Sequence, residues 1–151
     1  MSLKMGLVAK ASTTVHASAG KVWDALVNPE VIKQYMFGAE VESEWMEGSP
    51  IIWKGMWKGK EYKDKGVILK LEPKHVIRYS HFSPLSGLPD IPENYHTVTV
   101  RLTRKGNQTR ISLSQDNNPT AEALEDSEKN WGMMLARMKE LLEERKDKEK
   151  R

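Results

Sequence analysis

The sequence predicts an α+β fold in which a curved antiparallel sheet of about seven strands surrounds one long C-terminal helix, with two short helices after the first strand. Most of the chain's middle alternates apolar and polar residues, as half-buried strands do. The C-terminal part instead repeats apolar residues at helical spacing, at Leu124, Trp131, Leu135, Met138 and Leu142. Because that stripe needs a surface to bury it, we expect the helix to lie across the sheet.

The N-terminal third is predicted to hold one strand and two short helices. Residues Leu7–His16 alternate well enough for the first strand. Ser18 then provides an N-cap for a short helix. Asn28 caps a second helix over Pro29–Tyr35, because proline fits the first helical position.

The next two strands are expected at Ala39–Trp45 and Ile51–Trp57. If Trp45 pairs with Ile51, inward residues meet inward residues along the whole hairpin. The outward face of the first strand then carries a row of acidic residues, which we expect to be solvated rather than to form a metal or acid–base site: Glu40, Glu42 and Glu44.

Four more strands complete the predicted sheet, at Glu61–Glu72, His75–Ser83, Tyr95–Arg104 and Gln108–Asp116. In the first of these, Gly66 is expected at a bulge, and Val67, Leu69 and Leu71 are expected to share one face. The segment Pro84–Asn94 holds three prolines and is too irregular for a hairpin turn, so we expect a mobile loop at the rim.

The terminal helix is predicted to run from about Pro119 to Glu144, with Asn118 as its cap and a length of roughly 40 Å. The whole net charge of +3 lies in Arg145–Arg151, which we expect to continue or fray from this helix as a charged tail. A body without net charge argues against a nucleic-acid partner.

Composition excludes several classes of protein. The absence of cysteine rules out a disulfide framework, a thiolate metal site and a cysteine nucleophile, and favours a cytoplasmic location. No stretch of sequence approaches a membrane span or a signal peptide. Met5 is a candidate native start, with Met1–Lys4 ahead of it.

No motif in the sequence predicts a catalytic residue, a metal or a cofactor. There is no glycine-rich phosphate loop, no nucleophile elbow and no histidine pair at metal-ligand spacing. His81 and His96 fall on inward faces of neighbouring strands, and a metal there would need a third ligand that the sequence does not offer. The interpretation we favour is that each is hydrogen-bonded in a partly polar cavity.

Four tryptophans fall on inward faces, three on the sheet and one on the terminal helix. They either fill the gap between sheet and helix or wall a pocket for a planar or hydrophobic ligand, with tyrosine and histidine as polar points. The candidate ligand-binding residues are Trp45, Trp53, Trp57, Tyr79, His81, His96, Trp131 and Leu135.

Two motifs resemble a known family. The segment Val22–Glu30, with the sequence VWDALVNPE, is similar to the opening motif of the START-like (SRPBCC) superfamily, whose members adopt the helix-grip fold. Trp131-Gly132 ahead of Met138–Leu142 resembles the terminal-helix motif of the branch related to the activator of the heat-shock protein 90 ATPase. The resemblance covers about residues 8–143, and we expect residues 7–144 to form a single START-like domain.

The resemblance implies a hydrophobic cavity between sheet and helix, since members bind lipids, hormones, polyketides or other small apolar molecules. We therefore expect a non-enzymatic protein that binds a small hydrophobic or aromatic ligand and has no cofactor. One alternative is a protein-interaction or co-chaperone-like module, or a homodimer, that uses the glutamate row or the basic tail. A second alternative is a cyclase-like enzyme that uses a cavity histidine of the pair His81 and His96.

Overall fold

The computed structural model describes the backbone of residues 7–149 and the side chains of residues 7–144. The predicted native start at Met5, with Met1–Lys4 ahead of it, lies outside the described residues. The predicted charged tail rests on the side chains of residues 145–151, which also lie outside the described part. The elements in chain order are β1 (Leu7–Val15), α1 (Ala19–Val27), α2 (Pro29–Tyr35), β2 (Glu40–Ser43), β3 (Pro50–Trp57), β4 (Lys60–Glu72), β5 (Val76–His81), the 3₁₀ turns η1 (Pro84–Ser86) and η2 (Pro92–Asn94), β6 (His96–Lys105), β7 (Gln108–Asn118) and α3 (Ala121–Glu149).

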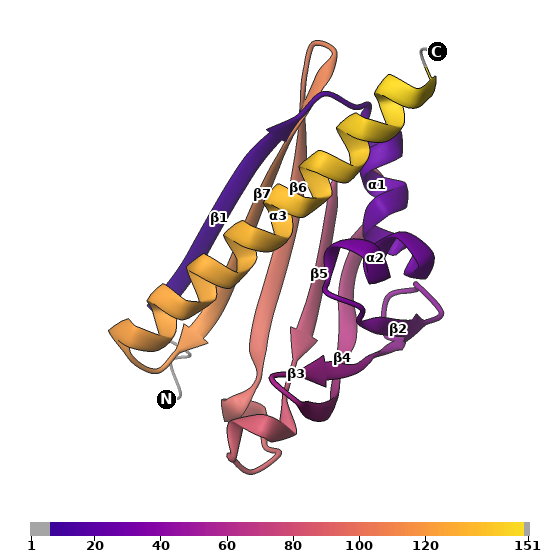
Figure 1. The fold of residues 1–151 in the computed structure, drawn as a ribbon. Helices are drawn as coiled ribbons and strands as arrows, with labels where there is room; N and C mark the ends of the chain where they lie inside the picture. The colour runs from indigo at the N-terminus through magenta and orange to yellow at the C-terminus, as the bar shows by residue number, and fades with distance from the viewer. Residues whose placement is uncertain (1–6, 150–151) are drawn as a thin grey trace.

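Within the described residues, seven strands form one antiparallel sheet in the order β1-β7-β6-β5-β4-β3-β2. The sheet curves around α3, which crosses it diagonally, while α1 and α2 lie on the same side as α3 beside the β2–β3 end (Figure 1). The predicted α+β helix-grip fold is confirmed.

Local capping fixes the two short helices where the sequence predicts them. The Ser18 side chain accepts a hydrogen bond from a backbone N–H of the first turn of α1 at 3.2 Å. The Asn28 side chain accepts one from the backbone N–H of Glu30 at 3.1 Å. Each cap satisfies a donor that the helix itself leaves unpaired. The buried Tyr35 hydroxyl donates to the Ala25 carbonyl at 2.7 Å and fixes α2 against α1.

The β2–β3 hairpin departs from the predicted register by two residues. Ser43, not Trp45, lies opposite Ile51. The reason is local: the Ser43 hydroxyl accepts the backbone N–H of Trp45 at 3.0 Å, and Trp45 takes a left-handed φ of 55°, which ends the strand. A shift of two residues keeps every side chain on its face, so the acidic row stays exposed as predicted: Glu40, Glu42 and Glu44.

The bulge in β4 also differs from its prediction. The register with β5 shifts just after Ile68, so the irregularity falls at Leu69 and not at Gly66. Ile68 is fully buried, whereas Val67 and Leu69 are exposed on the outer face. Beyond the bulge Leu71 returns to the core side. The predicted shared face is therefore wrong, because the extra residue inverts the alternation part-way along the strand.

The start of α3 is shifted from the predicted one. The helix begins at Ala121, and the Thr120 hydroxyl, not Asn118, accepts the first free N–H at 3.0 Å. Asn118 is instead the fully buried last residue of β7, where its amide donates to two backbone carbonyls and its oxygen accepts the Ser127 hydroxyl. Its tertiary contacts outweigh its capping preference, which leaves Pro119 outside the helix.

The apolar stripe of α3 closes the core against the inner face of the sheet. Its most buried members are Met134, Leu135, Met138 and Leu142. They join one cluster with inward residues of all seven strands, among them Ile68, Ile77, Val98, Val100, Ile111 and Leu113. In the part of the chain that the structure describes, no helix is long and apolar enough to cross a membrane.

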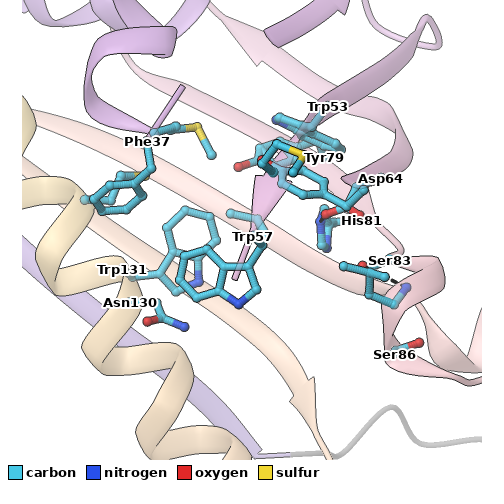
Figure 2. Close-up of a pocket in the computed structure, with 16 residues that line it drawn as sticks. Phe37, Trp53, Trp57, Asp64, Tyr79, His81, Ser83, Ser86, Asn130 and Trp131 are labelled. Carbon is cyan, nitrogen blue, oxygen red and sulfur yellow. Dashed lines mark hydrogen bonds and ion pairs between the residues drawn. The ribbon is translucent and has the colours of Figure 1, made fainter. Parts of the chain in front are cut away.

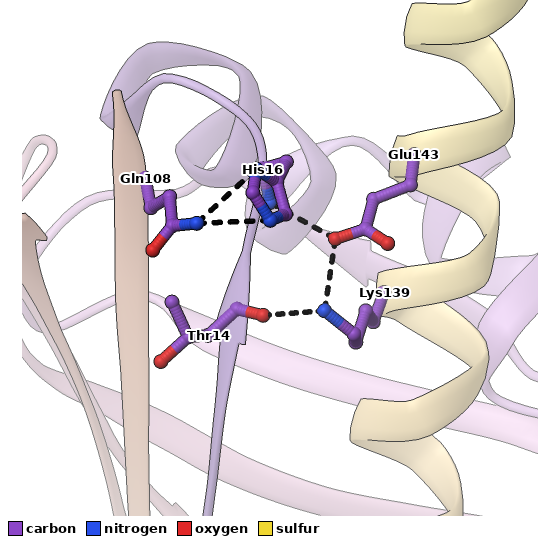
Figure 3. Close-up of polar contacts among 5 residues, drawn as sticks. All are labelled: Thr14, His16, Gln108, Lys139 and Glu143. Carbon is purple, nitrogen blue, oxygen red and sulfur yellow. Dashed lines mark hydrogen bonds and ion pairs between the residues drawn. The ribbon is translucent and has the colours of Figure 1, made fainter. Parts of the chain in front are cut away.

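Polar contacts attach the C-terminal half of α3 to the edge strand β1 (Figure 3). Lys139 Nζ donates to the Thr14 carbonyl at 2.7 Å and to Glu143 Oε2 at 2.9 Å. Glu143 Oε2 also accepts the backbone N–H of His16 at 3.0 Å, and the Gln108 amide lies 2.9 Å from the His16 ring. This network fixes the helix axis relative to the sheet and leaves the cavity at the other half of the helix.

Candidate functional site

A cavity of about 500 Å³ lies between the sheet and α3, within the size range of small-molecule sites. Its walls come from β3, β4, β5 and β6, from the N-terminal half of α3, from the segment after α2 and from the η1 turn. Figure 2 shows its side chains pointing into one common space. The segment predicted as a rim loop, Pro84–Asn94, thus contributes to the mouth through Leu85 and Ser86.

Large apolar side chains gather at the mouth of the cavity. Four large hydrophobic side chains that line it are between 41% and 58% exposed: Phe37, Met56, Trp57 and Leu85. Apolar side chains gathered around a hollow are typical of binding sites, whereas scattered ones carry no such meaning. Their exposure also shows that the cavity opens to solvent.

The inner wall is aromatic and held in place by specific contacts. The buried Trp53 ring lies 5.2 Å from the Tyr79 ring and meets the His81 ring edge-on at 5.1 Å. Burial raises the pKa of the Tyr79 phenol, which keeps it neutral at physiological pH. From α3, the Trp131 indole N–H donates to Gln115 Oε1 at 2.6 Å. That bond fixes the indole at the wall of the cavity.

The polar centre of the cavity is a pair of residues, Asp64 on β4 and His81 on β5. His81 Nε2 lies 2.8 Å from Asp64 Oδ2, and both side chains are largely shielded from solvent. Sequence analysis missed Asp64. Strand alternation could have identified it. Asp64 lies two residues after Tyr62 and four before Ile68, so it is a charged residue on the inward face of the strand.

Five of the predicted ligand-binding residues line this cavity together: Trp53, Trp57, Tyr79, His81 and Trp131. The other three do not. Trp45 borders a separate space of only about 40 Å³ beneath it. Leu135 is packed in the core, and His96 is not among the residues that line the cavity.

The predicted histidine pair does not open on one cavity. His96 is opposite His81 across β5 and β6, with ring centroids 6.2 Å apart. Its Nδ1 lies 2.9 Å from the Asp116 carbonyl oxygen, so the ring is engaged away from the cavity. The partner of His81 is Asp64. Among the described residues, no three histidine or acidic side chains lie together as a metal site would require.

Burial of His96 predicts a pH dependence of stability. Burial lowers the pKa of its imidazole in the folded state, and the nearby His81 acts in the same direction. The unfolded chain therefore takes up this proton first as the pH falls, and stability decreases below about pH 6.5. Urea unfolding from pH 7.5 to 5.5 measures this loss.

A matched pair of variants isolates the contribution of His96. His96→Gln should lose less stability over the same pH range than the wild type, whereas the exposed His75→Gln should follow the wild type. A steeper acid loss in His96→Gln would contradict this assignment. An NMR titration should place the His96 ring below the usual histidine range.

Comparison with known proteins agrees with this architecture. A family model described as activator of Hsp90 ATPase homolog 1-like protein matches residues 16–143. None of the curated proteins matches the sequence. The solution structure of ChR145 from Cytophaga hutchinsonii is similar, with 50% identity, a TM-score of 0.83, and coverage of 96% of this chain and 99% of that chain.

More distant solved structures share the fold. Protein MLL2253 from Mesorhizobium loti is 17% identical, with a TM-score of 0.75 over 91% of this chain and 98% of that chain. The Aha1 dimer from Colwellia psychrerythraea is 19% identical, with a TM-score of 0.69 over 88% and 93%. The family model spans most of the chain, and the protein therefore belongs to the family of activator of Hsp90 ATPase homolog 1-like proteins, within the START-like (SRPBCC) superfamily.

Proposed function

We propose that the protein binds a small, largely apolar ligand with an aromatic part in the cavity between the sheet and α3. The observation that carries this proposal is the cluster of exposed hydrophobic side chains at the cavity mouth: Phe37, Met56, Trp57 and Leu85. Leaving such surface in water is unfavourable by about 25 cal/mol per Å², and a bound apolar molecule would cover it.

The anchored walls support the proposal, because they oppose collapse of the cavity onto itself. Trp131 would have to break its hydrogen bond to Gln115 to move into the space. Trp53 is buried and its ring contacts those of Tyr79 and His81. A space kept open in this way is suited to planar ligands, which can stack on aromatic side chains at ring distances of about 4.5–7 Å.

The two alternatives have less support. For an interaction module, the acidic row would be the contact surface, but Glu40 and Glu42 already lie within ion-pair distance of Lys33 and Lys54. For a cyclase-like enzyme, the predicted acid–base pair of His81 and His96 does not face one cavity. A homodimer and a cytoplasmic location remain proposals of lower rank.

Blocking the cavity tests the proposal. Asn130 lines the mouth from α3 and is exposed, so Asn130→Trp should fill the entrance without disturbing the core. We expect 2-methylnaphthalene to shift the indole N–H signals of Trp53, Trp57 and Trp131 in NMR titrations of the wild type. Asn130→Trp should weaken this binding at least about tenfold, which is the effect of losing about 1.4 kcal/mol of contact.

Lys129→Trp is the matched control, because Lys129 is the exposed neighbour on the same helix and does not line the cavity. It should bind the probe like the wild type. Native mass spectrometry of protein purified from its own host should in addition reveal the natural ligand as an adduct. If the wild type shows neither an adduct nor any indole shift, the cavity is not a binding site and the proposal is wrong.

A further inference from the structure

One oxygen at the polar centre of the cavity has no partner. Asp64 Oδ2 is bonded to His81 Nε2, but Asp64 Oδ1 is buried and, among the side chains of residues 7–144, is the one buried side-chain N or O atom without a hydrogen bond. Buried polar atoms normally have a hydrogen-bond partner, because leaving one unpaired is unfavourable, and more so when the group is charged. A structure that leaves this acceptor unpaired therefore has a position for a donor.

The contacts between Asp64 and His81 hold Asp64 Oδ1 in one orientation. A carboxylate only accepts hydrogen bonds, so the imidazole donates its Nε2–H to Asp64 Oδ2. The His81 ring is in turn fixed by the edge-on contact with Trp53. Rotation of the carboxylate would exchange its two oxygens but would still leave one of them without a partner.

The polar side chains at the mouth, unlike Asp64 Oδ1, have hydrogen-bond partners or access to water. The Ser83 hydroxyl accepts the backbone N–H of Leu85 at 3.3 Å, and the Ser86 hydroxyl accepts that of Leu88 at 3.2 Å. Asn130 is exposed and can bond to water. Asp64 Oδ1, on the deep, shielded side of the cavity, is therefore the acceptor that still needs a donor.

We infer that Asp64 is the polar anchor of the cavity, and that its Oδ1 accepts a hydrogen bond from an O–H or N–H donor on an otherwise apolar ligand. The inference rests on the proposed function and narrows it to a ligand class. The ligand is an aromatic or alicyclic molecule with a hydroxyl or amine at its inner end. His81 acts as a positioning residue, because it orients Asp64 and lines the same wall.

Three probes of nearly equal shape test the inference: 2-naphthol, 2-methylnaphthalene and 2-methoxynaphthalene. Only 2-naphthol can donate a hydrogen bond. We expect the wild type to bind it at least about tenfold more tightly than either of the others, because hydrogen bonds to charged groups are stronger than those between neutral groups. Affinities come from NMR titration of the cavity-lining indole N–H signals.

Asp64→Asn should remove this preference, bringing the three affinities to within about twofold, because a neutral amide replaces the charged acceptor and also presents a donor. The indole N–H signals of unliganded Asp64→Asn should keep their wild-type dispersion, which shows that the variant is folded. Asp126→Asn, an exposed position on α3, removes the same charge and should keep the wild-type preference.

The outcomes separate the two proposals. If the wild type binds all three probes equally, the donor inference is overturned while ligand binding in the cavity stands. If 2-naphthol is preferred but Asp64→Asn keeps that preference, the anchor lies elsewhere and the inference is likewise overturned. If none of the probes binds, the proposed function itself fails. The wild-type comparison decides on its own if Asp64→Asn does not fold.

Discussion

Replacing Gly66 by alanine is expected to destabilise the protein by about 4 kcal/mol or more. A Cβ at this position would lie 1.7 Å from the Ser80 carbonyl oxygen and 2.6 Å from its carbon. Both are backbone atoms of β5 and cannot turn aside as the tip of a side chain would. The strands would have to separate where Lys65 and Phe82 exchange backbone hydrogen bonds.

Gly132→Ala provides the control, because a Cβ there meets no atom within 4 Å. Gly132 lies inside α3, where alanine is favoured over glycine by about 0.5–1 kcal/mol, so this variant should gain stability. Urea unfolding at pH 7.5 measures both changes. A loss below about 1 kcal/mol in Gly66→Ala would show that the two strands yield easily, which contradicts the close approach.

The elements that the sequence predicts correctly depend on neighbours along the chain. Ser18 and Asn28 cap helices through backbone donors two or three residues away, so their effect is visible in the sequence itself. The long alternating strands and the apolar stripe of α3 are likewise periodic signals. These features were sufficient to predict the helix-grip fold.

The elements that the sequence predicts wrongly depend on contacts between distant segments or on turn chemistry. Asn118 would cap a helix in isolation, but its amide pairs with the carbonyl of Leu7 across the sheet. The β2–β3 register shifted because the Ser43 hydroxyl competes with the ladder for the N–H of Trp45.

The contact between Asp64 and His81 at the polar centre of the candidate site could not be predicted for the same reason. Asp64 lies seventeen residues from His81 in sequence, and their contact depends on how β4 and β5 pair. The cyclase-like alternative joins His81 to His96, since both have inward positions on adjacent strands. Alternation gives the face of a side chain but not its depth, and here the depth decides which residues reach the cavity.

Depth also decides the role of Leu135, which the sequence predicts as a ligand-binding residue. Its side chain is 1% exposed and does not line the cavity. Leu135→Ala is therefore expected to cost about 2–5 kcal/mol in unfolding free energy, as the removal of a fully buried leucine does. Met133 on the same helix is 42% exposed. Met133→Ala should therefore change stability by less than about 0.5 kcal/mol.

Binding measurements distinguish a packing role from a ligand contact at Leu135. If Leu135 only joins α3 to the sheet, folded Leu135→Ala should bind 2-methylnaphthalene within about twofold of the wild type, because a site behind the wall contributes no direct contact. A variant with nearly unchanged stability but at least tenfold weaker binding would instead place Leu135 in contact with the ligand, as the sequence predicted. The cavity would then extend along α3 beyond its present wall, toward Met138.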